Sequence, residues 1–124
     1  MARKDSLRLR YVETIASAGL YSLRSESVET GYLYCIEHTA WEISLATSGG
    51  NTRCRLYIEG HGYKHYIAEQ NIPAANRLYT WSKNEFLHQG ERLVLDIDQA
   101  QATTVAQMLL LGYKEEIKTQ GGAV

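Results

Sequence analysis

The sequence predicts an all-β protein, specifically an antiparallel β-sandwich of about eight strands with a jelly-roll-like arrangement. Short runs rich in Val, Ile, Tyr, Thr and Leu recur along the chain, separated by Gly, Asn and Ser. There is a single Pro and no long apolar stripe of helical period. A chain of 124 residues can bury one core but is too short for two ordinary domains, so we expect one domain.

Four segments in the first half of the chain have strand composition, with several alternating between apolar and polar residues: 7–15, 18–24, 31–38 and 41–47. In the first segment, apolar residues alternate with Arg8 and Arg10. In the last, Trp41 shares one face with Ile43 and Leu45, so we expect Trp41 to belong to the core.

A glycine-rich turn comes before the next strand. The stretch "SGGN" at 48–51 predicts a hairpin that joins 41–47 to 52–59. In 52–59 we expect Tyr57 to be exposed beside two arginines. The apolar residues that oppose it are Cys54, Leu56 and Ile58.

The stretch "EGHGYKHYI" at 59–67 places His61 and His65 four residues apart, a spacing that zinc enzymes use on helices. On a strand the two residues would lie about 13 Å apart, at about 3.3 Å per residue, whereas Zn–N bonds are about 2 Å. Gly62 and the neighbouring tyrosines oppose a helix. We therefore expect a turn at 60–62 that leads into a strand, and no metal site.

The second half continues with a loop at 71–76, an extended segment at 77–82, a turn around Gly90 and a strand at 92–98. In that strand three apolar residues point inward: Leu93, Leu95 and Ile97.

Residues 99–117 fit two structures. One is a helical stripe of Ala102, Val105, Ala106 and Leu109; the other is a strand with Val105, Leu109, Leu111 and Tyr113 on one face. We favour the strand, because paired threonines lead into it and Gly112 would destabilise a helix interior.

Other residue pairs give little support for catalysis. Cys35 and His38 are three apart, which places them on opposite faces of a regular strand and prevents a thiolate–imidazole couple. Asp96 and Asp98 share one strand face, which we interpret as solvated rather than as a divalent-ion site. Phosphate-binding glycine loops and the Gly-x-Ser-x-Gly motif are absent. We expect no enzymatic activity, no metal and no cofactor.

Composition also limits the partners. The formal net charge is −1 and basic residues are interleaved with acidic ones, so we expect no nucleic-acid partner. No apolar run approaches the roughly 20 residues that cross a bilayer, and Glu13 interrupts any signal peptide, so we expect no membrane partner. Cys35 and Cys54 are too few for a disulfide framework, and we expect free, partly buried thiols, with a cross-strand disulfide between them as the alternative.

The expected organisation is a basic N-terminal arm at 1–10, a sandwich domain at 11–118 and a flexible C-terminal tail at 119–124. Nine Tyr and two Trp stand against one Phe, a bias that suits half-buried sheet faces and interfaces. The candidate interface residues are basic residues of the arm and aromatic residues expected at the surface: Arg3, Lys4, Arg8, Arg10, Tyr57, Tyr63, Tyr79 and Trp81.

Residues 78–117 pair a "Gly-Glu-Arg-Leu-Val-Leu" strand with a last strand that ends in "Leu-Leu-Gly-Tyr". This pattern resembles the C-terminal half of small β-sandwich virion proteins of tailed bacteriophages, such as head decoration or cement proteins. The resemblance implies a non-enzymatic protein that binds and stabilises the capsid surface. Its partners would be the major capsid protein or another virion protein and further copies of itself, in a virion assembled in the host cytoplasm. No functional residues carry over.

Two other functions fit the same sandwich. A carbohydrate-binding or receptor-binding module would stack a glycan on Trp81, Tyr79 or Tyr63. A small jelly-roll enzyme would need histidines that converge on one metal, and the chain offers four: His38, His61, His65 and His88.

Overall fold

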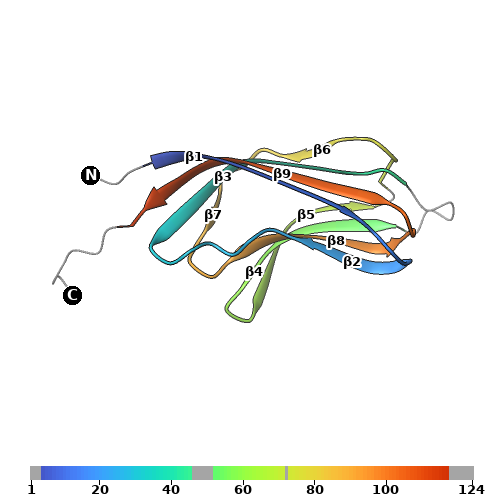
Figure 1. The fold of residues 1–124 in the computed structure, drawn as a ribbon, viewed down its shortest axis with the longest axis horizontal. Helices are drawn as coiled ribbons and strands as arrows, with labels where there is room; N and C mark the ends of the chain where they lie inside the picture. The colour runs from blue at the N-terminus through green and yellow to red at the C-terminus, as the bar shows by residue number, and fades with distance from the viewer. Residues whose placement is uncertain (1–3, 46–51, 72, 118–124) are drawn as a thin grey trace.

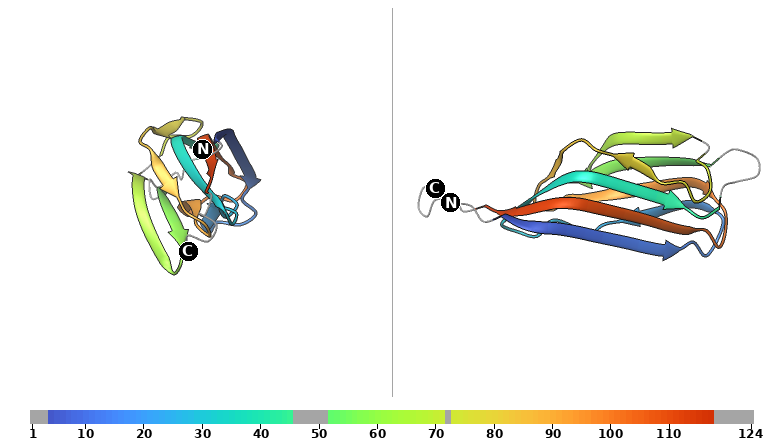
Figure 2. Two further views of the ribbon diagram at one scale, coloured as in Figure 1. Left: turned by 90° about the vertical axis from the view of Figure 1, so that its left-hand side faces the viewer. Right: turned by 90° about the horizontal axis from the view of Figure 1, so that it is seen from above.

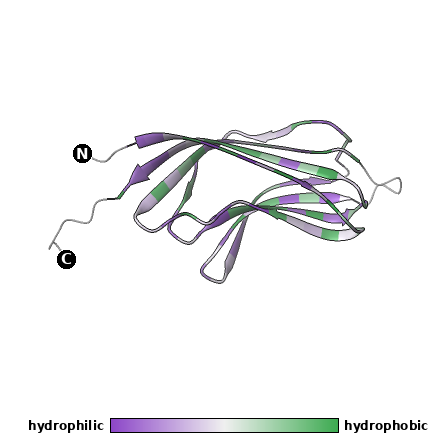
Figure 3. Cartoon of the chain, viewed as in Figure 1, coloured by the Kyte–Doolittle hydropathy of each residue, from purple (hydrophilic) through white to green (hydrophobic). Residues whose placement is uncertain are grey.

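The structure is a computed structural model that describes residues 4–45, 52–71 and 73–117. Within these residues the chain forms nine strands and no helix. The strands make two antiparallel sheets that pack against each other (Figure 1). Hydrophobic and hydrophilic residues alternate along many of the strands, as expected when one side of each sheet faces a core (Figure 3). The predicted all-β sandwich is therefore confirmed.

Each sheet has four strand positions. Sheet A has the order β1 (Lys4–Thr14), β9 (Val105–Glu116), β3 (Tyr32–Ile43) and then β6 (Tyr79–Trp81), with β7 (Glu85–Leu87) also paired to β3. Because β6 and β7 pair with successive parts of β3, they share one position. Sheet B has the order β2 (Gly19–Arg24), β8 (Arg92–Ala100), β4 (Arg53–Gly60) and β5 (Tyr63–Asn71).

The pairing follows a jelly roll. The first strand pairs with the last, β2 with β8, β3 with β6 and β7, and β4 with β5, all antiparallel. The start of β1 and the end of β9 lie at the same end of the elongated sandwich (Figures 1 and 2).

The core lies between the sheets and is made by the inward residues of both. Sheet B contributes Leu56, Leu95 and Ile97, and sheet A contributes Met108 and Leu110, all fully buried. Burying one side chain of this size stabilises the fold by about 2 kcal/mol. Trp41 is 3% exposed and belongs to this core, as predicted.

Most predicted strands are present. Residues 92–98 lie in β8 with Leu93, Leu95 and Ile97 inward, and the turn before them has Gly90 at φ 83°. The segment at 99–117 contains β9, so the strand interpretation is confirmed over the helix. The turn at 60–62 is also confirmed, since His61 and Gly62 have φ values of 52° and 84° and connect β4 to β5.

The predicted hairpin between 41–47 and 52–59 is wrong. β3 belongs to sheet A and β4 to sheet B, so the two strands are not paired. The whole of the predicted turn, 48–51, lies outside the described residues. The alternation that marks a strand does not identify its partner, and here the chain changes sheets. β3 also ends at Ile43, which leaves Leu45 38% exposed instead of in the core.

The predicted arm at 1–10 is largely part of the sandwich. β1 begins at Lys4, which pairs with Glu115 of β9, and the pairing continues without a break to Thr14. The backbone hydrogen bonds of this ladder make the segment an edge strand of sheet A, and residues 1–3 lie outside the described residues. The predicted tail at 119–124 also lies outside them.

A β-bulge changes the geometry around Cys35 and His38. The pairing with β9 shifts between Ile36 and His38, so Glu37 is an extra residue on β3. The extra residue reverses the alternation, and Cys35 and His38 point to the same side of sheet A. The prediction that they lie on opposite faces is therefore wrong.

Candidate functional site

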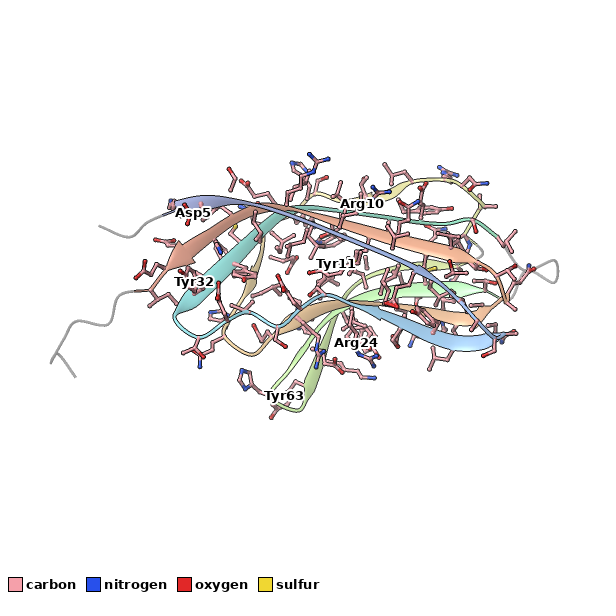
Figure 4. The ribbon with its side chains drawn as sticks, viewed as in Figure 1. Asp5, Arg10, Tyr11, Arg24, Tyr32 and Tyr63 are labelled. Carbon is pink, nitrogen blue, oxygen red and sulfur yellow. The ribbon has the colours of Figure 1, made fainter. Side chains whose placement is uncertain are left out.

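The sandwich presents two outer sheet surfaces, and these are the broadest candidates for binding. We call the outer surface of sheet A the A face and that of sheet B the B face. Figure 4 shows Arg10 on sheet A and Arg24 on sheet B at opposite sides of the molecule, with Tyr11 between the sheets. Because side chains alternate along a strand, the even-numbered residues of β1 lie on the A face and the odd-numbered ones point inward.

The A face gathers the basic residues that the sequence suggested as an interface. Lys4, Arg8 and Arg10 lie on this face of β1, while Arg3 lies outside the described residues. The Lys4 ammonium lies 5.1 Å from the centre of the Tyr113 ring on β9. Both Arg8 and Arg10 are exposed. The sequence therefore identified these three basic residues as neighbours, although it placed them on an arm instead of on a strand.

Apolar side chains surround these arginines. Register places Leu111 opposite Arg8, and Leu109 opposite Arg10. Both leucines are only half-buried. Three further apolar side chains are exposed on or beside this face: Val12 at 47%, Leu78 at 58% and Phe86 at 47%. The A face thus combines exposed apolar side chains with positive charge.

A shallow groove of about 210 Å³ crosses the A face between β1, β9, β3 and the segment before β6. Its apolar lining includes Ala40, Leu78 and Leu109, and Arg8 and Arg10 also line it.

A polar network fixes one side of the groove. Arg10 Nη2 donates to Gln107 Oε1 at 2.9 Å, and Gln107 Nε2 donates to Glu42 Oε1 at 2.8 Å. The network runs across β1, β9 and β3, so it holds these side chains in one arrangement.

The B face is different, because its arginines are paired with carboxylates. Arg53 and Arg55 both reach Glu69, at 4.0 Å and 2.7 Å. Arg53 also lies 3.7 Å from Asp98. Further along, Glu59 lies between two arginines, with Arg24 at 3.7 Å and Arg92 at 3.5 Å.

The prediction that Tyr57 is exposed is wrong, because its exposed fraction is only 1%. It lies on the outer side of β4 but is covered there, since its ring packs 5.1 Å from the Tyr66 ring and Lys64 lies over it. Its hydroxyl donates to Asp96 Oδ1 at 3.1 Å. Burial is the main cause that raises the pKa of Tyr57 to about 12, and Asp96 adds to the shift.

The other three aromatic candidates do not form one platform. Tyr63 is 78% exposed at the tip of the β4–β5 hairpin, in sheet B. Tyr79 and Trp81 lie on β6, at the edge of sheet A, and pack against the core. The Tyr79 ring stacks on Trp41 at 4.7 Å, and Trp81 Nε1 donates to Glu85 Oε2 at 2.9 Å.

The titratable residues show no metal geometry in the ranges that the structure describes, where no group of three or more His, Cys, Asp or Glu is placed to hold an ion. His38 Nδ1 lies 3.2 Å from Ser82 Oγ, and His61 Nε2 lies 2.9 Å from the Gln89 carbonyl oxygen. Cys35 and Cys54 are free, as predicted, and both are fully buried. No helix in the described part of the chain is long and apolar enough to cross a membrane.

Sequence reasoning missed the apolar half of the A face. Leu109 and Leu111 were recognised as sharing a strand face, but nothing indicated that this face is the outer one. The available signal was the pattern of three leucines in succession at 109–111, which puts apolar residues on both sides of a strand. The exposure of Leu78 and Phe86 depends on the path of the chain around β6 and β7.

Comparison with known proteins gives little guidance. No family profile matches the chain, and no curated protein matches it significantly. Among solved structures, a family two carbohydrate esterase from Cellvibrio japonicus is similar, with a TM-score of 0.33 and 14% sequence identity. The match covers 96% of this chain and 37% of that one, so the chain spans about a third of its length.

Proposed function

We propose that the protein is a non-enzymatic structural component of a virion, a head decoration or cement-type protein that binds and stabilises the capsid surface. The observation that supports this most is the A face, where half-buried leucines and exposed apolar side chains surround arginines. This combination fits a protein interface, in which an apolar core is surrounded by a polar rim and Arg is enriched. Binding would occur through a preformed sheet face in place of an extended arm.

The contrast between the two faces supports this choice. The B face has its arginines paired with carboxylates, so a partner would have to break existing ion pairs to use them. On the A face, Arg8 lies beside Leu111 and Arg10 bonds to a neutral glutamine. The A face is part of a folded sandwich, so no segment of the chain has to become ordered when a partner binds. The lower entropic cost of binding favours stable attachment to a large assembly.

A carbohydrate-binding module remains a second candidate, at a different place from the one the sequence suggested. Tyr66 on the B face is 50% exposed, and a depression of about 460 Å³ beside it is lined by Arg55 and Glu69. An exposed ring flanked by planar polar groups can stack on a sugar and bond to its hydroxyls. Saturable glycan binding that Tyr66→Ala abolishes and Trp81→Ala preserves would support this function.

The experiment that separates the two is a pull-down of the tagged protein from a lysate of its source, with partners identified by mass and complexes sized. Virion attachment predicts stoichiometric recovery on very large particles that contain capsid protein. Recovery of the protein alone, or release from its partners by free sugar, would contradict the virion assignment.

A further inference from the structure

Two arginines line the A-face groove, and Arg8 is the one that has no partner among the residues that the structure describes. Within residues 4–45, 52–71 and 73–117, it forms no ion pair and no side-chain hydrogen bond. Arg10, two residues along the same strand, is held by Gln107. A guanidinium prefers bidentate pairing with a carboxylate, and Arg8 is free to form one.

The groove beside Arg8 offers an apolar contact at the same place. Leu109 lies opposite Arg10 on the neighbouring strand, and Leu78, 58% exposed, lines the groove with it. Interface hot spots commonly consist of a side chain that fills a pocket, with surrounding contacts that exclude water from it. At about 210 Å³ the groove suits a single aliphatic side chain better than a small-molecule ligand, for which pockets of about 300 Å³ or more are usual.

We propose that this groove binds an acidic, aliphatic segment of a protein partner, with one aliphatic side chain between Leu78 and Leu109 and a neighbouring carboxylate paired to Arg8. The inference deepens the proposed function by naming the chemistry of the partner. A second copy of this chain is a poorer occupant, because its A face exposes Lys4, Arg8 and Arg10, while Glu42, the carboxylate that lines the groove, is already bonded to Gln107. A partner with carboxylates complements the same charges.

The test uses two synthetic peptides and the intact protein labelled with ¹⁵N. One peptide alternates Asp with Leu, and the other alternates Lys with Leu; each is titrated while amide shifts are followed by NMR. We expect the acidic peptide to shift amides around Arg8, Leu78 and Leu109, and the basic peptide to leave them unchanged. Equal responses to both peptides, shifts centred on the B face, or no shifts at millimolar peptide would overturn the inference.

Two variants test the roles of Arg8 and Leu78 in binding the acidic peptide. Arg8→Glu and Leu78→Ala change exposed side chains, so we expect both variants to fold. The dispersion of the amide signals in the NMR spectrum of each variant checks this. Each variant should weaken binding of the acidic peptide by at least about tenfold. Arg24→Glu, which makes the same charge change on the B face, should leave this affinity unchanged. Unchanged affinity in Arg8→Glu would contradict the assignment. If the protein is recovered on virions but the peptide shifts no A-face amides, this inference alone is overturned. If the peptide shifts A-face amides but the protein is not recovered on virions, the virion assignment alone is overturned.

Discussion

Tyr57 donates its hydroxyl proton to Oδ1 of Asp96, across the pair of central strands in sheet B, at a distance of 3.1 Å. Asp96 Oδ1 also accepts from the Ser22 hydroxyl on β2, so three strands are joined through one carboxylate. Tyr57 is 1% exposed and Asp96 is half-buried, so this is a partly buried polar connection on the outer side of a sheet. Such a hydrogen bond contributes about 1 kcal/mol to the free energy of unfolding. Tyr57→Phe should therefore lower this free energy by about that much near neutral pH.

The same contact predicts how stability depends on alkaline pH. Burial raises the pKa of Tyr57 from 10.0 to about 12, so the folded protein holds this proton more tightly than the unfolded chain does. The stabilisation is fully present below about pH 10 and is lost as the pH rises towards about 12, at up to about 1.4 kcal/mol per pH unit. Urea unfolding of the wild type and Tyr57→Phe should show a shallower alkaline decline in the variant; parallel declines would contradict this.

Gly112 should tolerate no side chain. A Cβ atom at this position would lie 1.9 Å from the carbonyl oxygen of Cys35, in the backbone of the bulged strand β3. Gly112→Ala therefore has to displace the bulge, and we expect it to destabilise the protein by about 3 kcal/mol or to prevent folding. Leu111→Ala, next to it and half-exposed, is the control and should cost less. Equal thermal shifts in the two variants would argue against the close packing described.

Thr103 should be the easiest position to stabilise. It has a φ of 69° in the turn between β8 and β9, a conformation that β-branched residues rarely adopt, and its side chain is exposed. Thr103→Gly removes the strain, and we expect a gain of about 1 kcal/mol, measured as a higher melting temperature. Ala102→Gly changes the neighbouring exposed residue, which has no positive φ, and should lower the melting temperature. A lower value for both would contradict the prediction.

The two cysteines should differ in how they become reactive. Cys54 lies in the core, where burial raises its pKa to about 12, and Cys35 lies beneath the A face opposite Phe86 of β7. Neither thiol should react with Ellman's reagent in the folded protein at neutral pH. Phe86→Ala removes a side chain paired with Cys35, and it should make that thiol reactive while Cys54 stays protected. Equal reactivity of both thiols would indicate general unfolding.

The fold was largely predictable because alternation is a local property. The strand at 92–98, the turn at Gly90 and the C-terminal strand all follow from residue order. Strand pairing was not predictable, and the supposed hairpin around 48–51 failed because β3 and β4 show the same alternation whether they pair with each other or with distant strands.

The candidate site was less predictable for a related reason. The bulge at Glu37 has no signature in the sequence, and it reverses the facing of Cys35 relative to His38. The alternation of residues along β4 predicts that Tyr57 points outward and is exposed. It does point outward, but Tyr66 on the next strand covers it. Burial on an outer face depends on neighbours across the sheet, and those neighbours are far apart in the chain.

Docking of the protein through the A face can be tested by side-chain footprinting with hydroxyl radicals, on the free protein and on the protein attached to particles from its source. We expect Leu78, Phe86 and Leu109 to become protected on the particles, while Leu20 and Tyr63, which are 67% and 78% exposed elsewhere, react unchanged. Protection of Tyr63 and Tyr66 with no change at Leu78 and Leu109 would contradict it and move the binding surface to sheet B.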